Sequence, residues 1–342
     1  MSTQAAVFFG ELLMRLGTKG FQRLLQANEF EVAYTGAEAN SAVSLANYGL
    51  DAFVVSAVPE TDIGQACINY VRRFGVNTDH IERCGKRLGT FYLETGASQR
   101  PSRVIYDRAG SSITELKRGD LRWEEILANK DWFHFSGTAP ALGNSMPAVV
   151  EEACHIAKEQ GLMISCDLNY RSNLWSTEQA NRTMSGLMKY VDVLCGNEED
   201  AERVFGIKAR DTDVTSGKMD EAEYIEVATE LSSRFDLKYV GITLRQSISA
   251  SDNNWSAMLY DGKNSYFSQK YAVHLVDRVG GGDAFSGALI YSLLTRMDPQ
   301  NAIDFAAAAS CLKQTIPGDF NLVSYDEVMT LVKGDVSGRV RR

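Results

Sequence analysis

The sequence predicts an α/β fold with a mostly parallel central sheet, helices on both faces of that sheet, and a small β-sheet lid. Three observations support this prediction. From residue 131 onward, short apolar runs alternate with longer amphipathic stretches, which is the pattern of strand–helix–strand units. Segments nearer the N-terminus alternate residue by residue between apolar and polar, as half-exposed strands do. Near the C-terminus, three glycines lead directly into a strongly apolar helical stretch.

Length and composition are those of an ordinary globular chain. Its 342 residues are 44% hydrophobic and 23% charged, which permits a sizeable core in one or two domains. The net charge of −9 argues against a surface for nucleic acid or anionic membranes. Six scattered cysteines without a C-x-x-C pair favour free thiols in a reducing cytoplasm. We expect neither a signal peptide nor a membrane span, because basic leader residues and a long apolar run are both missing.

The first elements of the central sheet are read from apolar runs. Residues 5–9 and 52–58 predict buried strands, and residues 76–81 predict a further strand. A helix is expected over 35–47, with small residues near its start, and a second helix from Thr61 to the glycine at position 75.

The lid is predicted from segments in which apolar and polar residues alternate. Such segments lie within residues 11–35, and a hairpin is expected from residues 91–95 and 103–107. We place the lid at about 11–35 and 88–110.

The C-terminal two thirds predict the parallel sheet. Strands are expected at residues 132–136, 162–168, 191–195 and 239–244, and helices at 148–159, 178–190, 198–205, 221–234 and 302–313. Ligands of such sheets bind at the carboxyl ends of the strands. The loops that begin near Asp167, Gly196 and Leu244 should therefore share one crevice.

The glycine run Gly280, Gly281 and Gly282 and the following Asp283 form the strongest candidate site. A helix is expected to begin at Asp283. Glycines before a helix let successive N–H groups converge, and the helix dipole adds positive potential, so an anion site results. A carboxylate there suits phosphoryl transfer, in which it takes a proton from an attacking hydroxyl. The alternative is a plain turn in which Asp283 caps the helix.

The pattern D-x-x-G-x-G-D-x-F at Asp277–Phe285 resembles the C-terminal signature of ribokinase-like sugar kinases, the phosphofructokinase-B family. The resemblance extends from Gly10 to about Leu331 and implies that residues 1–342 form one ATP-dependent kinase domain. It also implies that Asp283 is the catalytic base and that the three glycines form the anion hole. Arg278, Val279 and Gly281 depart from the usual D-T-x-G-A-G-D.

The resemblance also implies a sugar site. TGAEANSA at residues 35–42 is similar to the family motif G-G-x-x-x-N-x-A, which implies that Gly36 and Asn40 line this site. Asn40 read alone could equally bond a neighbouring loop. The D-x-N-x-R pattern that ends at Arg171 resembles the branch of the family that phosphorylates 2-keto-3-deoxygluconate. By the same resemblance, the substrate would also contact Tyr92, Tyr106, Arg108 and Asp319.

Tyr106 and Arg108 are two positions apart on an expected strand and should therefore face the same side. A tyrosine and an arginine that point inward suit a substrate with hydroxyls and a carboxylate. The alternative is a core tyrosine beside a solvated arginine.

The family resemblance also implies which residues bind magnesium and the nucleotide. Asn197 and Asp200 resemble the family's N-x-x-E motif, which supports Mg²⁺ through water, although they equally describe an acidic helix start. Asp277 is implied at a site for a monovalent cation such as K⁺. The segment 243–253 departs most from the family, and loop drift is an alternative there. The expected nucleotide contacts are Asn169, Asn197, Thr243, Arg245, Ser247, Gly280, Gly282 and Gly318.

We therefore expect a cytoplasmic kinase that uses ATP and Mg²⁺ to phosphorylate 2-keto-3-deoxygluconate at its C6 hydroxyl, and that pairs into a homo-oligomer through its lid. A kinase of a neutral sugar such as fructose or ribose is the nearest alternative. A sugar-binding protein without turnover is a second alternative. A dinucleotide-binding oxidoreductase is disfavoured, because a G-x-G-x-x-G fingerprint at the first strand is missing.

Overall fold

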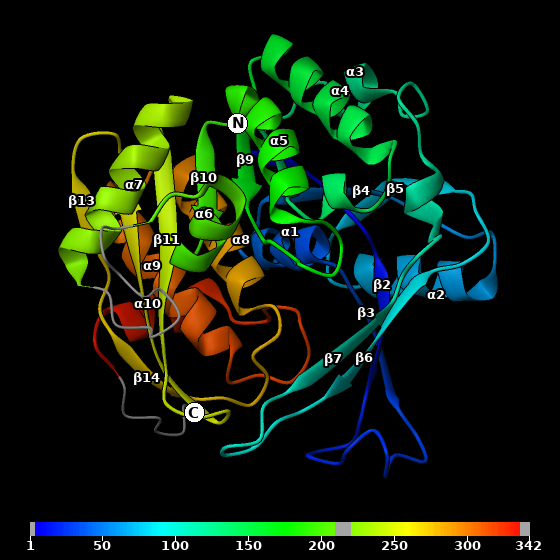
Figure 1. Ribbon diagram of the computed structural model, residues 1–342, viewed down its shortest axis with the longest axis horizontal. Helices are drawn as coiled ribbons and strands as arrows, with labels where there is room; N and C mark the ends of the chain where they lie inside the picture. Colours follow the sequence, from blue (N-terminus) through cyan, green and yellow to red (C-terminus); the bar gives the residue numbers. More distant parts are fainter. Residues whose placement is uncertain (1–3, 209–219, 336–342) are drawn as a thin grey trace.

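In a computed structural model, which describes residues 4–208 and 220–335, helices cover both faces of one large sheet (Figure 1). The edge-to-edge order of its strands is β13 (Ser265–Phe267), β12 (Asp252–Tyr260), β11 (Tyr239–Ser247), β10 (Val193–Gly196), β9 (Met163–Asp167), β8 (Trp132–Ser136), β1 (Ala5–Phe9), β4 (Asp51–Val58) and β5 (Asn77–Arg83). The strands from β11 to β5 are parallel, as predicted.

The helices form two layers. One face of the sheet is covered by α3 (Trp123–Ile126), α4 (Met146–Glu159), α5 (Thr177–Leu187), α6 (Glu198–Phe205) and α7 (Glu221–Phe235). The other face is covered by α1 (Ala37–Asn47), α2 (Asp62–Arg72), α8 (Gly281–Leu294), α9 (Pro299–Lys313) and α10 (Tyr325–Val332). Short 3₁₀ turns occur at Ser112–Glu115, Ala139–Ala141 and Met188–Tyr190.

Two hydrophobic cores result, one on each face of the sheet. β1 contributes to both, because successive side chains of a strand point to opposite faces. Phe9 packs against Trp123 in the first core, and Phe8 is buried in the second. A strand buried on both faces reads as a continuous apolar run, which is why β1 was predictable from sequence.

A second, four-stranded sheet lies beside the main body, at the lower right of Figure 1. Its strand order is β3 (Glu31–Thr35), β2 (Leu13–Gly17), β6 (Gly89–Glu94) and β7 (Arg103–Asp107). β2 and β6 are parallel, whereas the two outer pairs are antiparallel. We call this the small sheet; it is formed by the segments in which the sequence predicts a lid.

The C-terminal edge of the large sheet differs from the prediction. β11 continues to Ser247 rather than ending at 244, and β12 returns antiparallel to it, so Arg245 and Ser247 lie on a strand and not in a loop. A further strand, β14 (Tyr271–His274), pairs with β12. The end of β11 is exposed and polar, and it therefore lacks the apolar run by which the buried strands were predicted.

The other strands and helices predicted from the sequence are present, with their ends shifted by a few residues. All six cysteines are free thiols. None of the helices in the described part of the chain combines the length and hydropathy needed to cross a bilayer.

Candidate active site

One large pocket opens where the carboxyl ends of the parallel strands face the small sheet. Its volume is about 820 Å³, which suits a small-molecule site. Asp167 and Gly196 line it at the carboxyl ends of β9 and β10, and Thr243, Arg245 and Ser247 line it from the second half of β11, so the three predicted segments share one crevice although the third is a strand and not a loop. The small sheet closes another side of the pocket through Leu13, Phe91 and Tyr106.

The glycine turn forms the floor of this pocket, beside the start of α8. The helix begins at Gly281 rather than at Asp283, with Gly280 as its N-cap residue, so two of the three glycines lie in its first turn. Gly280 has φ +80°, and a Cβ there would lie 2.0 Å from the carbonyl oxygen of Asp319. Gly282 faces open space. The first N–H groups of a helix have no partner in an earlier turn of it. The N–H of Gly281 donates to the carbonyl of Arg278 over 3.4 Å, so among the described residues those of Gly280 and Gly282 are the donors that this turn presents to the pocket.

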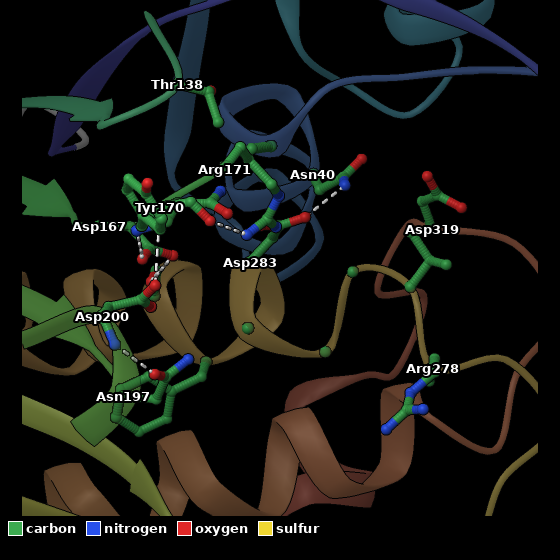
Figure 2. Close-up of a pocket in the computed structure, with 18 of the residues that line it drawn as sticks. Asn40, Thr138, Asp167, Tyr170, Arg171, Asn197, Asp200, Arg278, Asp283 and Asp319 are labelled. Carbon is green, nitrogen blue, oxygen red and sulfur yellow. Dashed lines mark hydrogen bonds between the residues drawn. The ribbon is translucent and has the colours of Figure 1, made fainter. Parts of the chain in front are cut away.

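Asp283 projects into the pocket from the first turn of α8, and Asn40 of α1 holds its carboxylate (Figure 2). The amide Nδ2 of Asn40 donates to Asp283 Oδ2 over 2.6 Å. Burial raises the pKa of Asp283 to about 6, against the lowering effect of this hydrogen bond. A carboxyl with such a pKa is largely ionised at neutral pH and can still take up a proton, as a general base must.

A polar chain connects Asp283 to the small sheet. The hydroxyl of Thr35 lies 2.7 Å from both Asn40 Oδ1 and Asp319 Oδ2. Arg15 of β2 forms ion pairs with Asp319 and, over 2.5 Å, with Asp277. The small sheet is thereby fastened to the residues just before the glycine turn and to the loop after α9, whose Asp319 lies beside Gly280.

Acidic side chains at the start of α6 form a further part of the pocket. One of them, Asp200, lies on the opposite side of Asp283 from Asp319 (Figure 2). Asn197 caps α6 by accepting a hydrogen bond from the N–H of Asp200 over 2.8 Å, and Asp200 accepts one from Tyr170 N–H over 3.1 Å. Burial raises the pKa of Asp200 to about 6 and that of Glu198 to about 7. Among the described residues, Glu198 Oε2 has no hydrogen-bond partner although it is buried. An oxygen of this kind fits a hard cation such as Mg²⁺.

Tyr106 and Arg108 both line the pocket, as predicted from their spacing. Arg108 is not free, however: its Nε donates to Glu11 Oε2 over 2.7 Å, and a second nitrogen of the guanidinium contacts the same oxygen. Ser111 donates to the other oxygen of Glu11. The Arg108 guanidinium also lies 5.1 Å from the Tyr106 ring centre. Glu11 thus neutralises Arg108 and orients it.

Arg171 is more available. It lines the pocket, is exposed, and donates to the carbonyl of the neighbouring Tyr170 over 2.9 Å. It lies close to Asp283 in Figure 2, and its positive charge lowers the pKa of Asp283 and Asp200. Asn169, two residues earlier, also lines the pocket and takes the left-handed conformation with φ +38°.

A basic pair borders the glycine turn. Arg245 at the end of β11 and Arg278 just before the turn both line the pocket. Burial lowers the pKa of Arg278, and the like charge of Arg245 lowers it further. Two cations held together beside unpaired N–H donors favour a polyanionic ligand. Ser247 lies two residues beyond Arg245 on the same pocket wall.

Three predicted site residues do not line this pocket: Tyr92, Gly318 and Asp277. Tyr92 follows Phe91 on β6 and therefore points to the opposite face of the small sheet, where its ring packs edge-on against Phe30. Phe91 takes the pocket position instead. Gly318 lies outside the lining and donates its N–H to Asp277 over 3.1 Å. The carboxylate of Asp277 is itself held by this N–H and by Arg15.

Sequence reasoning missed Glu11, Arg278 and Lys313 as site residues. Glu11 and Arg278 line the pocket, and Lys313 lies behind the glycine turn. Arg278 could have been found, because it stands inside the motif in place of a small residue. Glu11 and Lys313 carry no local signal, since each acquires its partners from segments distant in the chain.

The parallel α/β fold, the small sheet and the glycine turn with its carboxylate define an enzyme of the ribokinase-like class, one that transfers a phosphoryl group to a sugar. Residues 4–321 match the profile of the pfkB family of carbohydrate kinases. The chain belongs to this family, as its C-terminal signature implied.

Similar proteins of known structure or curated name point the same way. A 2-dehydro-3-deoxygluconokinase of Thermotoga maritima is 48% identical, with a TM-score of 0.94 over 97% of this chain and 99% of that one. A 2-dehydro-3-deoxygalactonokinase of Haloferax volcanii is 31% identical over 98% of this chain and 99% of its own length. A 2-dehydro-3-deoxygluconokinase of Thermoproteus tenax is 27% identical over 92% of this chain and 89% of its own length. The chain is thus a sugar kinase, and these three similar proteins are named as kinases of keto-deoxy sugar acids.

Proposed function

We propose that this protein transfers the γ-phosphoryl group of ATP to the C6 hydroxyl of 2-keto-3-deoxygluconate. The observation that carries the proposal is the position of Asp283. It stands at an anion-binding helix start, is oriented by Asn40, and shares its pocket with an arginine, Arg171. The names of the relatives support the same substrate class.

In the proposed mechanism, Asp283 accepts the proton of the sugar hydroxyl while that oxygen forms a bond to the γ-phosphorus. The bond between the γ-phosphorus and its bridging oxygen breaks, and ADP leaves. A positioned general base contributes about 10²–10⁴-fold to such a rate. Asn40 keeps the carboxylate aimed at the pocket, since its amide is hydrogen-bonded on one side to Asp283 and on the other to Thr35.

The glycine turn would stabilise the negative charge that develops on the transferring group, through the N–H groups of Gly280, Gly281 and Gly282. Arg245 and Arg278 would neutralise the nucleotide phosphates, with Asn169, Thr243 and Ser247 along the same wall. Asp200 and Glu198, with Asn197 nearby, fit a magnesium ion held through water, because their carboxylates are buried and Glu198 Oε2 has no hydrogen-bond partner in the described part of the chain. Mg²⁺ supplies charge neutralisation of the phosphates when it is bound.

The carboxylate of the sugar acid would bind chiefly to Arg171. Its planar guanidinium suits a two-point contact with a carboxylate. Arg108 contributes one remaining edge of its guanidinium, since Glu11 occupies the rest. Gly36, Tyr106 and Asp319 would contact sugar hydroxyls from the surrounding walls.

The small sheet would act as a lid that excludes water, because water would otherwise accept the phosphoryl group. Its outer surface carries exposed apolar side chains at Val32 and Ile105. These favour pairing of two lids in a homo-oligomer, where Tyr92 would lie near the contact.

A kinase of a neutral sugar is the second candidate, and one observation favours it. The Glu11–Arg108 pair is neutral as a whole, so this wall of the pocket offers little net charge to a carboxylate. The two functions differ in the role of Arg171, which contacts a carboxylate in one and a hydroxyl in the other.

The test is ADP release from Mg–ATP with 2-keto-3-deoxygluconate, its galactonate epimer, fructose, ribose, gluconate and no sugar. Turnover mainly with the keto-deoxy acids is expected, and product analysis should place the phosphate on C6. Turnover mainly with fructose or ribose would replace the proposal by the second candidate. Binding of Mg–ATP without turnover on any sugar would indicate a non-catalytic binding protein.

A further inference from the structure

Lys313, the last residue of α9, is buried completely in the middle of the active-site region. Its side chain is 0% exposed, which is rare for lysine because moving an ammonium out of water is costly. The Nζ atom donates to the carbonyl oxygen of Asp277 over 3.1 Å and to that of Val279. These two carbonyls lie immediately before the glycine turn.

The charges around this ammonium explain how it is tolerated. Burial lowers the pKa of Lys313, and Arg15 lowers it further, whereas the carboxylates of Asp277, Asp319 and Asp283 raise it. The ammonium therefore lies among carboxylates, on the side of the glycine turn that faces away from the pocket.

The contact with Val279 has a direct consequence for the anion site. Because a peptide unit is planar and trans, its C=O and N–H point in opposite directions. The carbonyl of Val279 and the N–H of Gly280 belong to the same peptide. A cation that draws this carbonyl backward therefore aims the N–H of Gly280 away from Lys313. The N–H of Val279 is fixed as well, through a 3.1 Å hydrogen bond to Asp277 Oδ1.

The same contacts bear on the monovalent cation that the family resemblance implies at Asp277. Carbonyl and carboxylate oxygens at this position would be its ligands. Two of these carbonyls are already bound by the Lys313 ammonium, and the carboxylate of Asp277 is bound by Arg15 and by the N–H groups of Val279 and Gly318. The residues present do not fit an added cation.

We infer that Lys313 is a built-in cation that positions the glycine turn, and that phosphoryl transfer by this protein needs no K⁺ or other monovalent metal ion. Lys313 acts through the backbone of Val279 and Gly280 and is a positioning residue. The inference rests on the proposed function for its kinetic consequences, but its structural part concerns the free protein.

The first test compares the wild-type protein in potassium, sodium, ammonium and tetramethylammonium chloride at equal ionic strength. The expected result is the same kcat, the same affinity for Mg–ATP and the same melting temperature in all four salts. Tetramethylammonium is too large for a carbonyl-lined cation site, so it serves as the cation-free reference. Activation or stabilisation of the wild type by potassium would overturn the inference.

The second test removes the ammonium in two ways. Lys313→Ala leaves a cavity with two unpaired carbonyls, whereas Lys313→Met fills the space without a charge. Misplacing the turn by about 1 Å should lower kcat about 100-fold in both, with a smaller effect on KM for the sugar. In Lys313→Ala, ammonium or potassium should restore part of kcat and raise the melting temperature, and neither should do so in Lys313→Met.

Lys158→Met is the matched control, because Lys158 also lies in a helix and pairs with a carboxylate, Asp192, far from the pocket. A purely structural role for Lys313 would lower stability without a cation-specific recovery of kcat, and that result would overturn the inference. Should Lys313→Ala fail to fold, the wild-type salt comparison still decides. Failure of the proposed function is distinguishable, because it would appear as no sugar turnover in any salt, while Mg–ATP affinity and melting temperature still report on the cation site.

Discussion

The amide of Asn40 donates a 2.6 Å hydrogen bond to the carboxylate of Asp283, although the two residues are 243 positions apart in the chain. Asn40 comes from the first turns of α1, and Asp283 from the first turn of α8. The two helices pack so closely that a Cβ at Gly287 would lie 2.7 Å from the carbonyl oxygen of Ser41. This packing sets the orientation of the proposed base.

Replacing Asp283 by asparagine should lower kcat by about 10²–10⁴-fold, because an amide cannot take the hydroxyl proton. Burial raises the pKa of Asp283, so its ionised form is costly in the folded state at neutral pH. The neutral amide should therefore unfold at the same or a higher temperature. Steady-state kinetics and a thermal melt measure both effects, with Asp298→Asn at the exposed N-cap of α9 as the control. Retention of most of kcat would remove Asp283 from the role of base.

Activity should fall as the pH drops through about 6, because Asp283 must be unprotonated to act and its pKa is raised to about 6. The hydrogen bond from Asn40 lowers this pKa, so Asn40→Ala should move the acid limb of kcat to higher pH. Asp200 also titrates near 6, and the Asn40 variant separates the two carboxyls because Asn40 bonds only Asp283 of this pair. An unmoved limb would assign it to another group.

Arg171→Lys should raise KM for a keto-deoxy sugar acid far more than KM for a neutral sugar, because lysine lacks the two-point fork. The comparison uses the same enzyme preparation with both kinds of substrate. Arg182→Lys, an exposed arginine in α5, is the control. Equal changes for acid and neutral sugar would argue against a carboxylate contact at Arg171.

Arg108→Met should destabilise the fold by about 3–5 kcal/mol, because it leaves the buried carboxyl of Glu11 without its cation. The double change Glu11→Leu with Arg108→Met should recover much of this loss, since no unpaired charge remains. Denaturant unfolding measures both. Arg87→Met, at the exposed Arg87–Asp107 pair, should cost at most about 1 kcal/mol. A double variant no more stable than Arg108→Met alone would contradict the pairing argument.

Arg278→Met should raise KM for Mg–ATP by about 10- to 100-fold, because a charge-assisted contact to phosphate contributes about 1.5–3 kcal/mol. KM for the sugar should change little. Arg245→Met should act in the same direction, since both arginines border the glycine turn. A rise confined to KM for the sugar would place Arg278 on the substrate instead.

Much of the fold could be predicted from local patterns. Continuous apolar runs marked the strands of the parallel sheet, because a strand buried on both faces admits few polar residues. Glycines marked several helix ends. The exposed end of β11 escaped prediction, since a polar strand end does not differ locally from a loop, and its antiparallel partner β12 was not predicted although it is largely buried. The start of α8 was placed two residues late, because glycine is a poor marker of the first helical turn.

The candidate site, like the fold, was predictable from sequence only in part. Asp283, its glycine turn and a crevice at the strand ends could be predicted from the sequence alone, because a glycine run before an apolar helix and the ends of buried strands are local patterns, and parallel strands present their carboxyl ends at the same edge of a sheet. Tertiary structure decided the rest. In the folded protein, Tyr92 points away from the pocket, Arg108 is paired with Glu11, and Lys313 is buried against the carbonyls that precede the glycine turn. Each of these depends on charges and packing brought together from distant segments, and the free energy of a buried charge depends on such neighbours rather than on the residues beside it in the chain.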